Sequence, residues 1–148
     1  MSAASAVASA NTAKTPRRLG RSVLAVFAGL FANALLSFIV DEGLHLFGVF
    51  PPWNQPYFGT GPYLAAVAYR AAFGVFGLYL TALLAPDRPL LHLWIGAGVG
   101  GLLSLGGVAA ALTTNMGPLW YPICLVALVP VAAWLAARIW RSRGSEGR

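Results

Sequence analysis

PYLAAVAYRAAFGVFGLYLTALL, residues 62–84, is an apolar stretch with one charged side chain, Arg70. A helix of about 20 apolar residues crosses the ~30 Å hydrocarbon core of a bilayer, so this stretch has transmembrane length. Arg70 lies on the order of 12 Å below one face of the membrane, at 1.5 Å per residue. A charge at that depth needs a partner or a water-filled space, unless its long side chain reaches the headgroups. We therefore predict a transmembrane helix with a polar site at Arg70.

The composition of the whole chain is that of an integral membrane protein. Of its 148 residues, 58% are hydrophobic and 9% are charged, which excludes an ordinary soluble domain. The pattern predicts an all-α integral membrane bundle of four transmembrane helices. The flanking residues 1–18 are expected to form a disordered tail with a basic end, and residues 142–148 a cytoplasmic tail. The predicted helices span residues 19–47, 62–85, 89–112 and 118–140.

The formal charge of +6 follows membrane topology and does not indicate nucleic acid. Arg21, Arg88 and the C-terminal arginines fall on one side of the predicted membrane, whereas Asp41 and Glu42 lie near the other side, which receives no Lys or Arg. Basic residues stay on the cytoplasmic side of a membrane. Both termini are therefore predicted to be cytoplasmic (N-in, C-in). An amino-acid composition rich in Ala, Gly and Arg suggests that the protein belongs to a bacterial inner (plasma) membrane.

Few residues could support catalysis or metal binding. Cys124 is the only cysteine, which excludes an intrachain disulfide. Glu42 and His45 form an ExxH pattern of the kind that binds di-iron centres, but one copy supplies too few ligands. There is no phosphate-binding loop and no nucleophile elbow. We predict no enzyme activity, no metal and no cofactor.

Polar residues recur on the first predicted helix at steps of four. Asn33, Ser37 and Asp41 span about 80° of its circumference and form one polar stripe. Asp41 and Glu42 point about 100° apart, so at most one of them faces Arg70. Asp41 is the predicted partner, because it continues the stripe of Asn33 and Ser37. The pair is either a structural clasp between two helices or part of a cavity that opens to the outer side. The candidate ligand or ion-pair residues are Arg70, Asp41, Glu42, His45, Asn33 and Ser37.

Small residues concentrate on the third predicted helix, where spacings of four allow helix backbones to approach closely. This helix is the expected central packing element. The favoured function is accordingly a non-enzymatic packing or interaction component of the membrane, which forms a homo-oligomer or binds a membrane partner protein. The alternative is a small transporter or channel with a polar site between the first two helices. The predicted packing residues are Gly96, Gly100, Ser104, Ala97 and Gly101.

The connection between the first two helices is rich in proline and aromatic residues. Aromatic side chains gather at membrane interfaces, so we favour an interfacial belt. The alternative is a lid over a cavity between the helices. Its aromatic residues are Phe47, Phe50, Trp53, Tyr57 and Phe58.

Four short motifs resemble those of a group of uncharacterised bacterial four-helix inner-membrane proteins. They are Phe50-Pro51-Pro52-Trp53, then Gly77-Leu78-Tyr79-Leu80-Thr81-Ala82 with Ala85-Pro86-Asp87-Arg88-Pro89, and Gly117-Pro118-Leu119-Trp120-Tyr121-Pro122. The resemblance covers residues 21–137. It implies the four-helix fold and brings no activity.

Overall fold

The computed structural model of the chain describes residues 15–145, and the side chains of residues 19–143. In this part of the chain there are four α-helices. Each contains a segment long and apolar enough to cross a membrane. The predicted all-α, four-helix architecture is thus confirmed for the described residues. The helices are α2 (Thr15–Leu46), α3 (Thr60–Leu84), α4 (Pro89–Thr114) and α5 (Trp120–Ser145).

The helix ends follow local stop and start signals. α2 ends before Gly48, whose φ of 70° is a left-handed conformation that glycine adopts without strain. α4 starts with Pro89 in its first turn and ends at Thr114, before the C-cap residue Asn115, which is also left-handed. α2 begins at Thr15 and α5 ends at Ser145, so both helices extend into the segments predicted as tails. Residues 1–14 and 146–148 of those tails lie outside the described residues.

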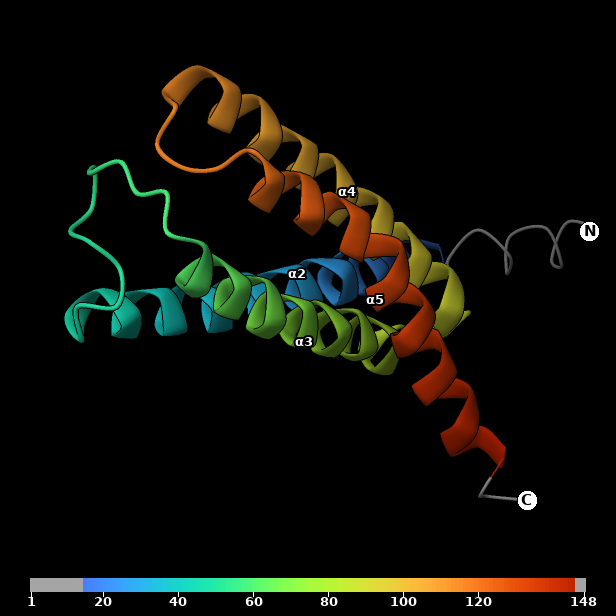
Figure 1. The fold of residues 1–148 in the computed structure, drawn as a ribbon. Helices are drawn as coiled ribbons and strands as arrows, with labels where there is room; N and C mark the ends of the chain where they lie inside the picture. Colours follow the sequence, from blue (N-terminus) through green and yellow to red (C-terminus); the bar gives the residue numbers. More distant parts are fainter. Residues whose placement is uncertain (1–14, 146–148) are drawn as a thin grey trace, which may run out of the picture.

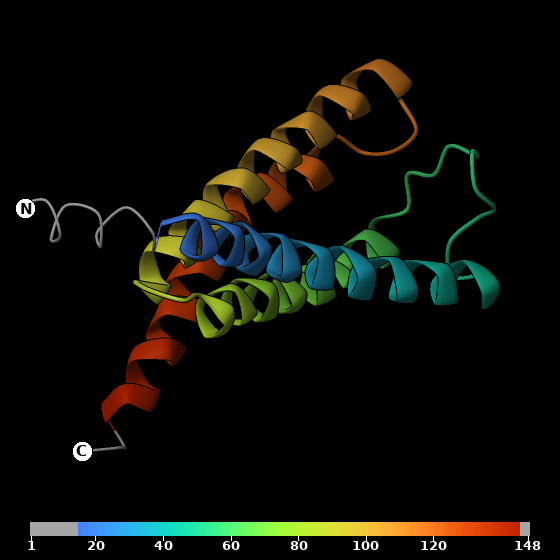
Figure 2. The ribbon, with the colours of Figure 1, turned by 180° about the vertical axis from the view of Figure 1, so that it is seen from behind.

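The helices form two antiparallel hairpins, α2 with α3 and α4 with α5 (Figure 1). The hairpins cross near the end of the molecule that contains the start of α2 and the α3–α4 turn, here called the terminal end. They diverge toward the end that contains the connections 47–59 and 115–119, here called the loop end (Figure 2). The two ends of the molecule are therefore packed differently.

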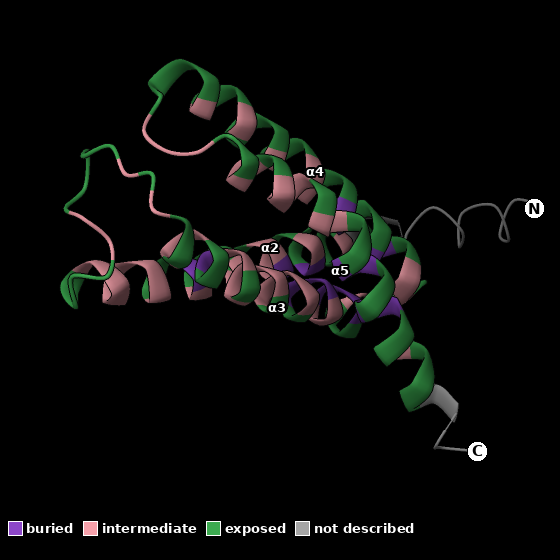
Figure 3. Ribbon diagram, viewed as in Figure 1, coloured by how far each residue is buried: buried purple, intermediate pink, exposed green. Residues whose placement is uncertain are grey.

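The hydrophobic core lies in the half of the molecule nearer the terminal end, where the hairpins cross, and it consists mainly of alanine (Figure 3). Ala133 and Ala136 of α5 and Leu93 of α4 are fully buried. Small side chains let helices approach closely, which increases van der Waals contact between them. The core residues are Leu78, Ala82, Leu93, Ala97, Ala132, Ala133, Ala136 and Ala137.

Within the first hairpin, α2 and α3 meet backbone to backbone at Gly29 and Gly77. A Cβ atom on either glycine would overlap the backbone carbonyl of the other. The Thr81 hydroxyl, which donates a hydrogen bond to the Gly77 carbonyl (3.0 Å), fills the space beside them. The tightest glycine contact thus lies outside the helix in which the sequence led us to expect it.

The small residues of α4 have mixed environments. Gly96 and Ala97 are buried, and a Cβ on Gly96 would contact Leu78 of α3. Gly100 and Gly101 are only partly buried. α4 contacts each of the other three helices, as a central packing element should, and so does α3.

Candidate functional site

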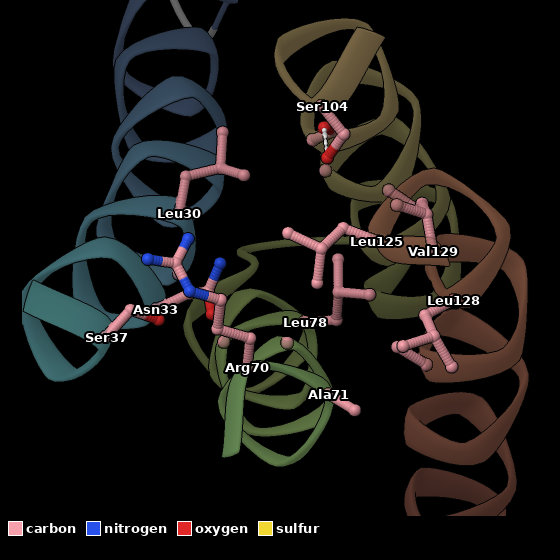
Figure 4. A pocket seen from close by; sticks show the side chains of 17 residues that line it. Leu30, Asn33, Ser37, Arg70, Ala71, Leu78, Ser104, Leu125, Leu128 and Val129 are labelled. Atoms are coloured by element: carbon pink, nitrogen blue, oxygen red, sulfur yellow. Dashed lines mark hydrogen bonds between the residues drawn. The ribbon is translucent and has the colours of Figure 1, made fainter. Parts of the chain in front are cut away.

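A cavity of about 150 Å³ lies between the two hairpins, on the loop-end side of the alanine core. It forms where the hairpins begin to diverge, and all four helices contribute to its wall (Figure 4). Most of the wall is apolar or glycine. The polar or charged side chains that line it are Asn33 and Ser37 of α2, Arg70 of α3 and Ser104 of α4.

Arg70 is held by an ion pair with Asp41, the partner that the sequence predicts. Its Nη2 donates a hydrogen bond to Asp41 Oδ2. Arg70 starts about 15 Å from the loop end of α3, whereas Asp41 lies about 7 Å from that end of α2. The long arginine side chain bridges the difference. Arg70 therefore leans toward the loop end while its stem lines the cavity.

Two tyrosines complete the surroundings of this pair. The Tyr69 hydroxyl donates a hydrogen bond to Asp41 Oδ1, so both carboxylate oxygens have a donor. On the other side, the Arg70 guanidinium carbon lies 6.0 Å from the centre of the Tyr121 ring, within the range of a cation–π contact. Arg70 thus joins α3 to both α2 and α5, which belong to different hairpins.

Two residues that line the cavity each have a buried polar atom without a hydrogen-bond partner in the described part of the chain. These atoms are Nε of Arg70, a donor, and Oδ1 of Asn33, an acceptor. Both residues line the cavity, and Figure 4 shows the Arg70 side chain extending from α3 toward Leu30 and Asn33. A buried polar atom without a partner is uncommon in folded proteins and calls for an explanation.

The cavity wall confirms the polar stripe of α2 in part. Asn33 and Ser37 line the cavity, and Asp41 continues the stripe to the ion pair. Ser37 is buried. Asn33 also lies at the α2–α3 contact, where its Cβ atom is next to Gly77. The stripe therefore forms one side of the site.

Glu42 and His45 lie apart from this site. Glu42 accepts a hydrogen bond from Trp53 Nε1 (3.3 Å). The His45 ring donates from Nδ1 to the main-chain carbonyl of Asp41 (2.8 Å) and stacks on Trp53 at 3.9 Å. Their partners thus belong to the helix end and the loop. Among the described residues, no three His, Cys, Asp or Glu side chains come together in a way that could hold a metal.

Aromatic side chains join the loop ends of the hairpins. Tyr63 contacts Tyr121 at 4.8 Å, and the backbone N–H of Tyr57 donates to the Met116 carbonyl (3.0 Å), which links connection 47–59 to connection 115–119. Trp53 and Phe58 remain exposed, as an interfacial belt requires. Connection 47–59 thus contacts the neighbouring connection and also exposes aromatic side chains. The aromatic cap consists of Phe50, Tyr57, Tyr63, Trp120 and Tyr121.

The sequence reasoning missed Tyr69, Tyr63 and Tyr121. Tyr69 directly precedes Arg70, and a phenol beside an intramembrane charge is a usable signal. Tyr121 and Tyr63 had no such signal, because their role depends on the angle between the hairpins. Comparison of the chain with protein-family models, curated proteins and solved structures finds no match.

Proposed function

We propose that this chain is a small transporter of a bacterial inner membrane that binds a solute in the cavity between its hairpins. The lengths and compositions of the four described helices support membrane insertion. Arg21, Arg88 and the arginines at the end of α5 lie toward the terminal end, and the loop-end connections contain no Lys or Arg. The positive-inside rule then puts both termini in the cytoplasm and the loop end outside.

The observation that carries the proposal is the polar wall of the cavity. An unpaired buried donor or acceptor costs about 1–3 kcal/mol, and two residues of this wall, Arg70 and Asn33, carry one of each. A cavity of this volume can hold a molecule the size of benzene. A purely structural link between the helices would require the Arg70–Asp41 ion pair but no cavity beside it. Binding of a solute would account for the ion pair and for the cavity.

The position of the cavity also supports transport. In many transporters the substrate site lies near the bilayer midplane, between two structural repeats. Here the cavity lies between two helical hairpins, with the alanine core on its terminal-end side and the aromatic cap nearer the loop end. Movement of one hairpin against the other would expose the site to one side at a time.

Cysteine labelling from outside tests this proposal. In a Cys124→Ala background, Ser37→Cys places a thiol in the cavity wall, and Ala25→Cys places one on the same helix at a buried position outside it. We expect a small, membrane-impermeant thiosulfonate added outside intact spheroplasts to modify the first variant and not the second. No modification of the first variant, or equal modification of both, would contradict the proposal.

A second candidate is packing against another copy or a membrane partner. Added Cβ atoms on Gly98, Gly106 and Gly107 of α4 would meet no atom of the described chain, so this part of α4 could accept a neighbouring helix. With Cys124→Ala as background, Gly106→Cys tests it by bismaleimide crosslinking in native membranes. A crosslinked dimer or a captured partner supports this role, and recovery of monomers alone contradicts it.

A further inference from the structure

Tyr63 of α3 connects the two hairpins at the loop end. Its ring lies 4.8 Å from the ring of Tyr121, at the start of α5. Its hydroxyl donates to the main-chain carbonyl of Tyr57 (3.2 Å), and the backbone N–H of Tyr57 donates to the carbonyl of Met116 in the connection after α4 (3.0 Å). Tyr63 therefore takes part in two links between the hairpins, one between rings and one through the backbone.

Gly117 provides the space that the Tyr63 hydroxyl occupies. A Cβ atom on Gly117 would overlap Tyr63 Oη and would lie 3.3 Å from the carbonyl oxygen of Tyr57. The backbone at this position does not require glycine, because Gly48 is the only described glycine with a positive φ. Gly117→Ala would thus act through steric overlap. The overlapped atom is the end of a side chain, which can turn to another rotamer while both helices stay folded.

These contacts lie between the cavity and the loop end, on the side where α3 packs against α5. Tyr121 precedes Leu125, a wall residue of the cavity, by four residues, so it lies about 6 Å nearer the loop end. Tyr63 precedes Arg70 by seven residues and lies about 10 Å nearer that end. The Tyr121 ring is also 6.0 Å from the Arg70 guanidinium carbon. A shift of Tyr63 can therefore reach the cavity wall through one intermediate side chain.

Different residues hold the hairpins together on the terminal side of the cavity. Ala133 and Ala136 are fully buried in the alanine core, where the hairpins cross (Figure 1). Loss of the Tyr63 contacts would leave this core in place, so the hairpins could separate further at the loop end by turning about it. Hinge movements of this kind separate rigid elements without unfolding them. One ring contact and one neutral hydrogen bond are weak enough to break in such a movement.

We propose that Tyr63, Gly117 and Tyr121 form a latch, here called the loop latch, which keeps the hairpins together at the loop end, and that its release opens the cavity to the outside. The loop latch is closed in this structure. Tyr63 is the moving part, since its hydroxyl occupies a space that a side chain at residue 117 would fill. This inference rests on the proposed function, because it assigns the control of access to the same cavity.

Outside labelling of Ser37→Cys in the Cys124→Ala background tests the loop latch when Gly117→Ala is added. The added methyl group excludes Tyr63 from its position, and we expect the impermeant thiosulfonate to react at least about fivefold faster, a factor that corresponds to the loss of one ring contact. Gly61→Ala, in the first turn of α3, is the matched control, because a Cβ atom there would meet no atom within 4 Å. It should leave the labelling rate within about twofold of the parent rate.

Tyr63→Ala shows whether Gly117→Ala acts through Tyr63. Removal of the ring should accelerate labelling by a similar factor, and Gly117→Ala added to it should cause no further change, because the overlapped atom is already gone. Additive effects of the two substitutions would overturn the inference. Ala25→Cys, buried outside the cavity, should stay unlabelled in both variants. Its labelling would show that the variants lose the fold instead of opening at the loop end, and would also overturn the inference.

The outcomes separate the loop latch from the proposed function. Equal labelling rates of Ser37→Cys with and without Gly117→Ala and Tyr63→Ala would refute the loop latch and leave the proposed cavity in place. If Ser37→Cys is labelled neither in the parent nor in the two latch variants, both proposals fail.

Discussion

The terminal half and the loop half of the molecule use the same four helices and pack them differently. In the terminal half, the helices meet through alanine, and Ala133 and Ala136 are completely buried. In the loop half, larger side chains such as Arg70, Leu125 and Tyr121 stand between the hairpins, and a cavity remains beside them. Small side chains thus accompany close packing of the hairpins at one end, and larger side chains and a cavity accompany their divergence toward the other.

The contrast also shows where polar groups can be tolerated. Arg70 and Asp41 lie in the loop half, where the pair, Tyr69 and Tyr121 surround one another. The alanine core has no room for such groups.

Removal of Asp41 should have the largest effect on stability. Asp41→Ala leaves the partly buried Arg70 without its carboxylate, and we expect a loss of about 2–3 kcal/mol in the free energy of unfolding. Unfolding in bilayers by steric trapping measures it. Glu42→Ala is the matched control, because Glu42 bonds only an exposed tryptophan, and it should cost less than about 1 kcal/mol. Equal losses of unfolding free energy in both variants would show that the ion pair does not stabilise the fold.

Two glycine substitutions compare the close helix contact at Gly29 with the cavity wall at Gly100. Gly29→Ala forces a methyl group against the Gly77 backbone and should destabilise the fold by about 1–2 kcal/mol. Gly100→Ala places its methyl group 3.6 Å from Leu30, an ordinary contact, and should stabilise α4 by about 0.5 kcal/mol. The same unfolding measurement checks both signs. Destabilisation of similar size at both positions would mean that no space exists beside Gly100.

Tyr121→Leu tests the link between the cavity and the aromatic cap. The substitution removes the cation–π contact with Arg70 and the ring contact with Tyr63, and we expect a loss of about 1 kcal/mol. It should also speed the outside labelling of Ser37→Cys, because the cap loses a ring that joins the hairpins. Leu119→Ala, an exposed position just before α5, provides the comparison. Unchanged labelling kinetics would show that the cap does not limit access.

Trp53→Phe should have the smallest effect. It removes the N–H group that Glu42 accepts from but keeps a ring that can stack on His45. Because Trp53 is exposed, we expect a change below about 0.5 kcal/mol and no change in labelling of Ser37→Cys. A larger change in unfolding free energy or in labelling would show that Glu42 and His45 contribute to the site.

Local sequence signals predicted the elements and one contact of the site. Apolar length placed all four helices, and proline and glycine marked most of their ends. The pairing of Arg70 with Asp41 followed from depth and direction along two neighbouring helices. These properties depend on residues that are close in sequence or on one shared interface, which is why they can be read from a single chain.

The remaining features depend on how the hairpins cross. Nothing in the sequence distinguishes Gly29 and Gly77 from other small residues, because their contact forms only when α2 and α3 pack in register. The contact of Tyr121 with Arg70 joins residues of different hairpins, and its formation requires the crossing angle. That angle results from packing over the whole alanine core. Periodicity within one helix carries no information about it.

Water-edited solid-state NMR of the chain in bilayers tests the central claim most directly, that the loop half holds a polar cavity and the terminal half is closed. The experiment compares magnetisation transfer from water to the Arg70 guanidinium and to the Ala133 methyl group. We expect rapid transfer to Arg70 and none to Ala133, which is fully buried. Transfer equally absent from both sites would contradict the account.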